Sequence, residues 1–418
     1  MIQTHTYGSG LKLIVRTTDF LRSVSIGVFA AAGSAFETQK NNGISHFTEH
    51  MLFKGTNKRT AFDIAECIDR IGGQINAYTS KENTCYYTRS VSEHFEYCAE
   101  VLSDIVFDSV FAQDELEREK KVVQEEISMQ EDSPEDLCHE YLAGAFFKGN
   151  PLAMTILGTP ENVSGFTRDD IIDYMAKRYC ARNMVVSIVG DIAFDKTVDV
   201  VGKYFDARIT HGCELTDFAP PHVTAPAFVC KKKEIEQANI ALAFPCYAFN
   251  DPRSYSASLF STVFGGGMSS RLFQRIREQQ GLAYSVYTYV SSYKQNGLFS
   301  VFLGTNPANT DKALASIKSE IGEVVQNGLT EQEFEKGKAQ MKGAFIMGQE
   351  SASSVLNAMG KLLLLGNEAY DMDKRLSEID AVTMQSVRDA AEYTLDMSKM
   401  SGSIVGPQEY NLEFGVST

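Results

Sequence analysis

The sequence predicts an α+β protein made of two homologous, α/β-sandwich-like domains, each an antiparallel-rich sheet with helices packed on it. Three observations support this prediction. The chain has 418 residues, which is long for one hydrophobic core, and 44% of them are hydrophobic, as is usual for a globular protein. A proline-rich connection lies near the midpoint of the chain. The strand, helix and hairpin signals follow the same order on its two sides.

The connection runs from about Asp206 to Pro226 and contains the pair Pro220-Pro221. Consecutive prolines with few apolar neighbours are typical of a linker, because proline lacks the N–H that a sheet or helix needs. We therefore expect an N-terminal domain over residues 1–212 and a C-terminal domain over residues 213–418.

Each half begins with two strand signals, continues with a helical stretch and a glycine, and then reaches a hairpin. The opening strands are expected at residues 11–15 and 23–30 in the first half, and at residues 228–232 and 238–244 in the second. The hairpin strands are expected at residues 74–79 and 84–91, and at residues 283–293 and 298–304. The second hairpin turns at Asn296-Gly297, which is a strong hairpin signal.

A charged helix follows each hairpin, and residues 114–117 align with residues 332–335. In this alignment Glu119 falls on Gly337 and Glu126 falls on Ala344. The two copies therefore share a helix, but only the first copy carries this pair of acids.

Composition excludes some classes of partner. The chain has 39 Lys and Arg residues against 54 Asp and Glu residues, a net charge of −15. This balance disfavours nucleic acid, which binds basic surfaces. It is compatible with basic or neutral polypeptides, although acidity also simply favours solubility.

No apolar stretch approaches the length of a membrane span, and the N-terminus reads as neither a secretory signal nor a transit peptide. We therefore expect a cytoplasmic protein without a membrane partner. The eight cysteines are scattered and form no C-x-x-C pair, so we expect reduced, mostly buried thiols.

The strongest chemical signal is the run His46-Phe47-Thr48-Glu49-His50. Residues four apart share a helix face, so two imidazoles there can bind one zinc ion with a carboxylate beside it. This is the order of the inverted zinc-peptidase motif H-x-x-E-H. A surface helix with two solvated histidines is the alternative, but the flanking apolar residues favour a buried helix, in which such polar groups need partners.

A catalytic zinc ion takes three protein ligands and keeps one open position. On the helix expected over residues 114–130, Glu119 and Glu126 lie two turns apart on one face, beside Val122. Two acids on an apolar face need compensation, which makes Glu126 a candidate third ligand. The other interpretation is an exposed, charged helix, and spacing alone leaves both open.

Beyond these patterns, the sequence resembles the pitrilysin and mitochondrial processing peptidase family, and within it the short, single-unit bacterial members. The resemblance covers nearly the whole chain. It rests on residues 43–56 (GISHFTEHMLFKGT), 72–79 (GGQINAYT), 119–126, 183–186 (NMVV), 264–273 (FGGGMSSRLF) and 276–284 (IREQQGLAY).

The resemblance implies one zinc ion per chain, with Glu126 as the third ligand and Glu119 as an acid that supports the ligands. It implies that Arg277 and Tyr284 reach the active site from the other half of the enzyme. On their own, they would read as a charge at a helix end and as an aromatic residue in a strand. It also places Asn76 and Ala77 on a strand whose edge binds an extended substrate.

The implied function is a zinc-dependent endopeptidase that hydrolyses peptides or unfolded polypeptides, with Glu49 as the catalytic base. By resemblance, two copies form a chamber as a homodimer, in which Arg277 and Tyr284 act in trans. The alternatives are a non-catalytic, substrate-binding subunit of a heterodimeric peptidase and a structural zinc domain. The first typically loses the motif or the distal glutamate, and the second requires a fourth ligand that is not found near the motif.

Overall fold

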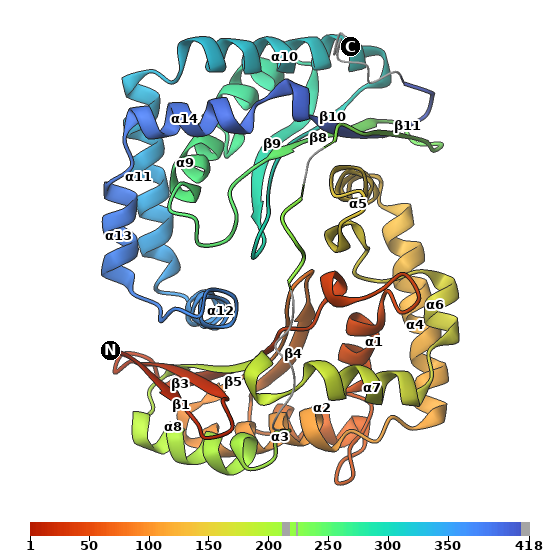
Figure 1. Cartoon of the computed structure of the whole chain (residues 1–418), viewed down its shortest axis with the longest axis vertical. Coiled ribbons are helices and arrows are strands. Elements are labelled where there is room, and N and C mark those ends of the chain that lie inside the picture. The colour runs from red at the N-terminus through yellow and green to blue at the C-terminus, as the bar shows by residue number, and fades with distance from the viewer. Residues whose placement is uncertain (211–217, 223–224, 411–418) are drawn as a thin grey trace. The chain divides into compact units, whose positions relative to one another are not determined.

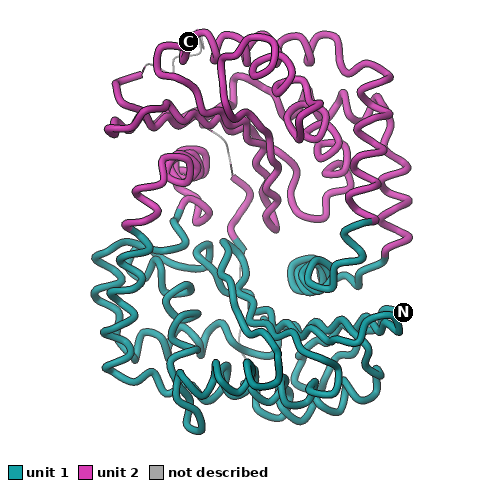
Figure 2. Tube along the Cα trace, turned by 180° about the vertical axis from the view of Figure 1, so that it is seen from behind, with its two compact units in different colours: residues 1–127, 154–218, 347–371 teal, residues 128–153, 219–346, 372–418 magenta. Residues whose placement is uncertain are grey.

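A computed structural model describes residues 1–210, 218–222 and 225–410, which form two compact units (Figures 1 and 2). Each unit contains one β-sheet with helices packed on it, which confirms the predicted fold class. The domain boundary predicted between residues 212 and 213 lies outside the described residues.

Each unit is assembled from three stretches of chain, and Figure 2 shows unit 1 in teal and unit 2 in magenta. Unit 1 comprises Met1–Ile127, Met154–Phe218 and Met347–Asp371. Unit 2 comprises Ser128–Ala153, Ala219–Ile346 and Met372–Thr418. Each unit therefore contains a segment from the opposite half of the sequence, a feature that the sequence patterns did not predict.

The sheet of unit 1 has six strands in the order β1-β2-β6-β3-β5-β4. Their bounds are β1 Ile2–Thr6, β2 Lys12–Thr17, β3 Ser23–Ala30, β4 Gln74–Thr79, β5 Thr84–Val91 and β6 Met184–Gly190. All neighbouring pairs are antiparallel except β2 and β6. The first predicted hairpin is confirmed, with β4 and β5 at the expected bounds. Because β4 pairs only with β5, it is an edge strand among the described residues.

The helices that contribute to unit 1 come from both halves of the sequence (Figure 1). They are α1 Ile44–Met51, α2 Ala61–Asp69, α3 Phe95–Asp108, α4 Gln113–Asp132, α6 Pro160–Gly165, α7 Arg168–Arg178, α8 Phe194–Val201 and α12 Ala352–Lys361, with α4 continuing into unit 2. The π-helical stretch Leu362–Gly366 follows α12. The helix predicted over residues 114–130 is confirmed as α4.

The sheet of unit 2 has five strands in the order β7-β11-β8-β10-β9. Their bounds are β7 Phe228–Lys232, β8 Ala238–Pro245, β9 Ala283–Ser292, β10 Gly297–Thr305 and β11 Ser401–Gly406. Only β7 and β11 pair in parallel. The helices are α5 Pro134–Phe146, α9 Ser254–Gly265, α10 Thr310–Asn327, α11 Glu331–Gly348, α13 Met372–Asp380 and α14 Met384–Thr394, with α11 ending in unit 1. Among the described residues, no helix combines the length and apolar character that crossing a membrane requires.

Two exchanged helices complete the sheets. In unit 1, α12 packs on β3 and β6, and the Ser187 hydroxyl donates to the carbonyl of Leu356 at 3.0 Å. In unit 2, α5 packs on β8 and β11, and the Cys138 thiol donates to the carbonyl of Asn239 at 3.2 Å. Each helix therefore packs on strands that come from the other half of the sequence.

Most described cysteines match the sequence-based expectation. Six of them are free, and all of these except Cys230 are buried. Cys180 is disulfide-bonded, which corrects the expectation of a reduced thiol at that position. Spacing in the sequence gives no information on which distant thiols the fold brings into bonding distance.

We expect Gly360→Ala to destabilise unit 1. A Cβ at Gly360 would lie 2.3 Å from the ring of Phe29, which is fully buried and has little room to shift. Such overpacking costs about 1–3 kcal/mol of unfolding free energy. Gly343→Ala in α11 is the matched control, since a Cβ there meets nothing within 4 Å and alanine favours helix. Thermal unfolding of both variants would test this, and equal midpoints would contradict the packing described.

Candidate metal centre

The helix that carries the motif is fixed at its N-terminus by a buried carboxylate. Glu37 accepts from the backbone N–H of Gly43 at 2.7 Å and from the N–H of Ser45 at 2.8 Å, as well as from the Ser45 hydroxyl. These N–H groups at the first turn of α1 have no partner inside the helix, so the carboxylate satisfies them. Gly43 has φ 100° and packs against Gly158, where a Cβ would clash at 2.7 Å. The orientation of α1 is therefore tightly constrained.

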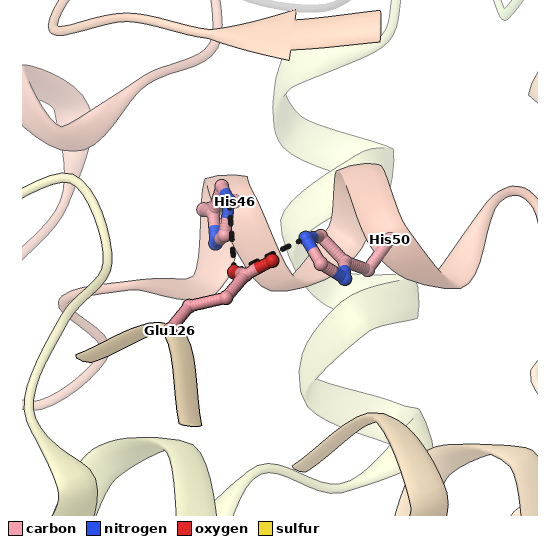
Figure 3. Close-up of side chains that lie close together, drawn as sticks. All are labelled: His46, His50 and Glu126. Atoms are coloured by element: carbon pink, nitrogen blue, oxygen red, sulfur yellow. Dashed lines mark ion pairs between the residues drawn. The ribbon is translucent and has the colours of Figure 1, made fainter. Parts of the chain in front are cut away.

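Three side chains meet on one side of α1 (Figure 3). His46 and His50 lie one turn apart on α1, and Glu126 reaches them from α4. Their candidate ligand atoms all lie within 4.8 Å of one another. The Glu126 Oε2 atom is 3.7 Å from His46 Nε2 and 3.5 Å from His50 Nε2. Among the described residues this is the only cluster of at least three such side chains.

The geometry of this group fits a metal ion better than hydrogen bonds. The two N–O separations are longer than the usual 2.7–3.2 Å hydrogen bond. They are close to the roughly 3.4 Å edge of a tetrahedron whose ligands stand about 2.0–2.1 Å from zinc. Glu126 Oε2 is buried and has no hydrogen-bond partner. Two imidazoles and one carboxylate are also a ligand set typical of catalytic zinc.

Glu119 orients one of the imidazoles. Its Oε2 lies 3.0 Å from His50 Nδ1, and its Oε1 lies 2.8 Å from the ammonium of Lys54. Glu119 is buried, and these two contacts compensate its charge. When His50 donates its Nδ1–H to Glu119, the lone pair of Nε2 is left on the side of Glu126, as metal ligation requires.

The electrostatics keep one histidine neutral. Burial, with a smaller contribution from the charge of His50, lowers the pKa of His46 to about 3. Burial also lowers the pKa of His50, but the hydrogen bond to Glu119 and the nearby carboxylates outweigh it, so the pKa of His50 is raised. For Glu119 the hydrogen bonds from His50 and Lys54 outweigh burial and lower its pKa, so it stays ionised.

Glu49 lies on α1 between the two histidines in sequence and is held by a contact from the sheet. The Thr79 hydroxyl at the end of β4 donates to Glu49 Oε2 at 2.5 Å. Burial raises the pKa of Glu49, and the hydrogen bond from Thr79 partly opposes this shift. A carboxylate with a raised pKa is a better proton acceptor, which suits a general base.

Asn76 and Ala77 lie on the edge strand β4, as the resemblance predicted. The backbone N–H of Ala77 donates to the side-chain oxygen of Asn76 at 2.8 Å. The Asn76 side chain thus accepts from a backbone N–H to which an added strand could also bind. Their role in substrate binding stays a prediction.

Arg277 and Tyr284 are neighbours within unit 2. Arg277 lies on the π-helical stretch Phe273–Gln279 and Tyr284 on β9, with the guanidinium carbon 4.9 Å from the centre of the tyrosine ring. The Tyr284 side chain is 73% exposed. Their predicted contribution to the active site remains a prediction.

Sequence reasoning missed three residues that hold the site in place, namely Glu37, Lys54 and Thr79. Lys54 and Thr79 lie inside the motif runs, but nothing in the sequence distinguished them from ordinary helix-end and strand residues. Glu37 precedes the motif helix, where an acid near a helix N-terminus is a weak local signal that could have found it.

Two family models match successive parts of the chain. Residues 13–160 match the model described as insulinase (peptidase family M16), and residues 165–341 match the model described as peptidase M16 inactive domain. The fold is therefore that of a two-domain M16 protein. The chain belongs to peptidase family M16.

Several bacterial proteins are similar along nearly the whole chain. The uncharacterized zinc protease YmxG of Bacillus subtilis is 38% identical over 410 residues, which cover 97% of this chain and 100% of that protein. An uncharacterized zinc protease of Streptomyces coelicolor is 34% identical over 412 residues, or 97% of this chain and 90% of that one. These names support a peptidase at the level of the family.

Solved structures confirm the fold. A protease from Helicobacter pylori has a TM-score of 0.90 at 21% identity, covering 97% of this chain and 99% of that one. A Pseudomonas fluorescens protein described as a peptidase M16 inactive domain has a TM-score of 0.91 at 21% identity, covering 98% and 99%.

We expect Glu119→Gln to weaken zinc binding by about tenfold or more, because the variant loses the charge that orients His50 and raises its basicity. The measurement is zinc affinity by competition with a chromogenic chelator. Glu117→Gln is the control, since Glu117 is exposed on the same helix and pairs with Lys120. Equal zinc affinities of the Glu119→Gln variant and the wild-type protein would show that Glu119 does not support metal binding.

Proposed function

We propose that this chain is a zinc-dependent endopeptidase that hydrolyses peptides or unfolded polypeptides. The observation that carries the proposal is the convergence of His46, His50 and Glu126 beside Glu49. A group of three protein ligands leaves one coordination position open, which is the arrangement of catalytic rather than structural zinc. The zinc protease names of the relatives support the same activity.

The ligands are His46, His50 and Glu126, and one zinc ion binds per chain. Zinc in such a site supplies Lewis acidity, which activates a water molecule and polarises the scissile carbonyl. Glu49 accepts the proton of the attacking water and passes it to the leaving amine. The hydrogen bond from Thr79 holds the Glu49 carboxylate in one orientation for both transfers.

The substrate binds as an added strand on the open edge of β4. Backbone hydrogen bonds to such an edge do not depend on side chains, so many sequences can bind. Asn76 and Ala77 lie on this edge, and the Asn76 side chain must release the N–H of Ala77 for a substrate carbonyl to take its place.

The active form is a homodimer in which Arg277 and Tyr284 of one subunit complete the site of the other. The exposure of Tyr284 supports this assignment, because its side chain is available to contact a substrate, and Arg277 stacks beside its ring. A guanidinium and a phenol are suitable donors to the developing oxyanion. A non-catalytic partner subunit is the second candidate, but the complete set of Glu49 and three ligands argues against it.

Glu49→Gln should retain one zinc ion per chain and lower kcat by about a hundredfold to ten-thousandfold, because the base is lost while the ligands remain. The measurement is cleavage of a quenched casein-derived peptide mixture, together with the metal content. Glu161→Gln, an exposed acid in the same unit, is the control. Wild-type cleavage should disappear with chelator and return with zinc. Full activity of Glu49→Gln would exclude Glu49 as the base, and a wild-type protein that binds zinc without cleaving would favour the non-catalytic subunit.

Complementation tests the trans arrangement. Glu49→Gln and Tyr284→Phe should each be inactive alone, and mixing equal amounts under exchange conditions should restore about a quarter of wild-type activity, since half of the dimers then hold one intact site. Mixing should restore nothing if each chain uses its own Tyr284. A fully active monomer by sedimentation would contradict the dimer itself.

A further inference from the structure

A lysine on the exchanged helix α12 lies beside the strand that carries the proposed substrate edge. Lys361 is the last residue of α12, and its ammonium lies 5.5 Å from the ring centre of Tyr78 on β4. Both residues belong to unit 1. At this distance the cation contacts the ring face, and the contact also fixes where the charge lies.

Tyr78 is itself held in place. Its hydroxyl donates to the side-chain oxygen of Asn357 at 2.6 Å, and the Asn357 amide donates to the carbonyl of Ser353 at 2.9 Å. Lys361 and Asn357 lie four residues apart and therefore on the same face of α12. The result is a fixed aromatic surface with a cation next to it, between helix α12 and the edge of the sheet.

The charge of Lys361 has no acidic partner among the described residues. Some lysines of unit 1 do have one, such as Lys54 with Glu119 and Lys203 with Glu96. Lys361 is only partly exposed, and burial lowers its pKa. A partly buried ammonium without a counter-charge is unfavourable unless a ligand supplies one.

The pleat of β4 decides which part of a substrate could meet this charge. The Thr79 side chain points to α1, where it contacts Glu49, whereas the Tyr78 side chain points to α12. A substrate strand added to this edge has the same alternation, so its side chains face the metal site and Lys361 in turn.

We propose that Lys361, with Tyr78 beneath it, forms a subsite that binds a carboxylate of the substrate. The carboxylate is either the side chain of an acidic residue on the α12 side of the bound strand or the free C-terminus of the peptide. This inference rests on the proposed peptidase function and adds a specificity to it.

The test uses quenched peptides that are identical except for one acidic group. In the first arm the C-terminus is amidated and each position in turn carries Glu or Gln. In the second arm all side chains are neutral and the C-terminus is either free or amidated. The wild-type enzyme should prefer the carboxylate form in one arm by about fivefold in kcat/KM, mainly through KM, as expected of a charge-assisted contact.

Lys361→Gln should abolish this preference while cleaving the neutral peptides as the wild type does, and Lys361→Arg should keep part of it. Lys12→Gln is a matched control and should leave the preference unchanged. Lys12 is also partly buried, with its pKa lowered by burial and a neutral partner in Asn367. It lies on β2, which β6, β3 and β5 separate from β4.

The outcomes separate the two proposals. A preference in the first arm identifies an acidic side chain, and one in the second arm identifies the C-terminus. No preference in either arm, or the same preference in Lys361→Gln, overturns the subsite. Equal slowing of all peptides by Lys361→Gln also overturns it, since Lys361 would then act only by holding Tyr78. Failure of the wild-type enzyme to cleave any peptide would instead refute the peptidase proposal, and this inference with it.

Discussion

Burying a helix that carries two imidazoles and a carboxylate is the constraint on which the site depends. On α1, Phe47 and Met51 are fully buried, so the polar side chains between them cannot all turn to water. Each polar group must find a compensating partner or bear a large desolvation cost. The partners come from several other elements: Glu37 from the preceding loop, Glu119 and Glu126 from α4, and Thr79 from β4. The need to compensate α1 thus brings together the parts that a metal site requires.

The two carboxylates of α4 meet this constraint in different ways. Glu119 is fully engaged by His50 and Lys54, so it can orient a ligand but has little capacity left to bind an ion. Glu126 keeps a buried oxygen without a hydrogen-bond partner, close to both imidazoles. Although they lie only two helical turns apart, the carboxylate of Glu119 has its hydrogen-bond partners, whereas that of Glu126 is available to bind an ion. This difference is the physical basis for assigning one residue as support and the other as ligand.

Local patterns predicted much of this molecule. The hairpin strands of the first half and the long helix α4 follow from alternation, turn residues and charge, and His46, Glu49 and His50 follow from helical spacing. Features that depend on contacts between distant residues could not be predicted in this way. Spacing alone left the role of Glu126 undecided, because only the contacts between α4 and α1 show which of the two acids lacks a hydrogen-bond partner. The exchange of α5 and α12 cannot be predicted from the sequence, since the apolar face of a helix does not indicate which sheet it packs on. Thr79 and Glu37 were missed for the same reason, as their partners are defined by the tertiary fold.

Zinc K-edge X-ray absorption on the zinc-loaded protein is the most direct test of the central claim, that His46, His50 and Glu126 hold the metal. The account predicts multiple-scattering features of two imidazoles, further oxygen ligands at about 2.0–2.2 Å and no sulfur shell. Replacing Glu126 by Gln should change the oxygen shell and leave the imidazole features intact. A sulfur shell near 2.3 Å, or a spectrum that Glu126→Gln leaves unchanged, would place the metal elsewhere and contradict the account.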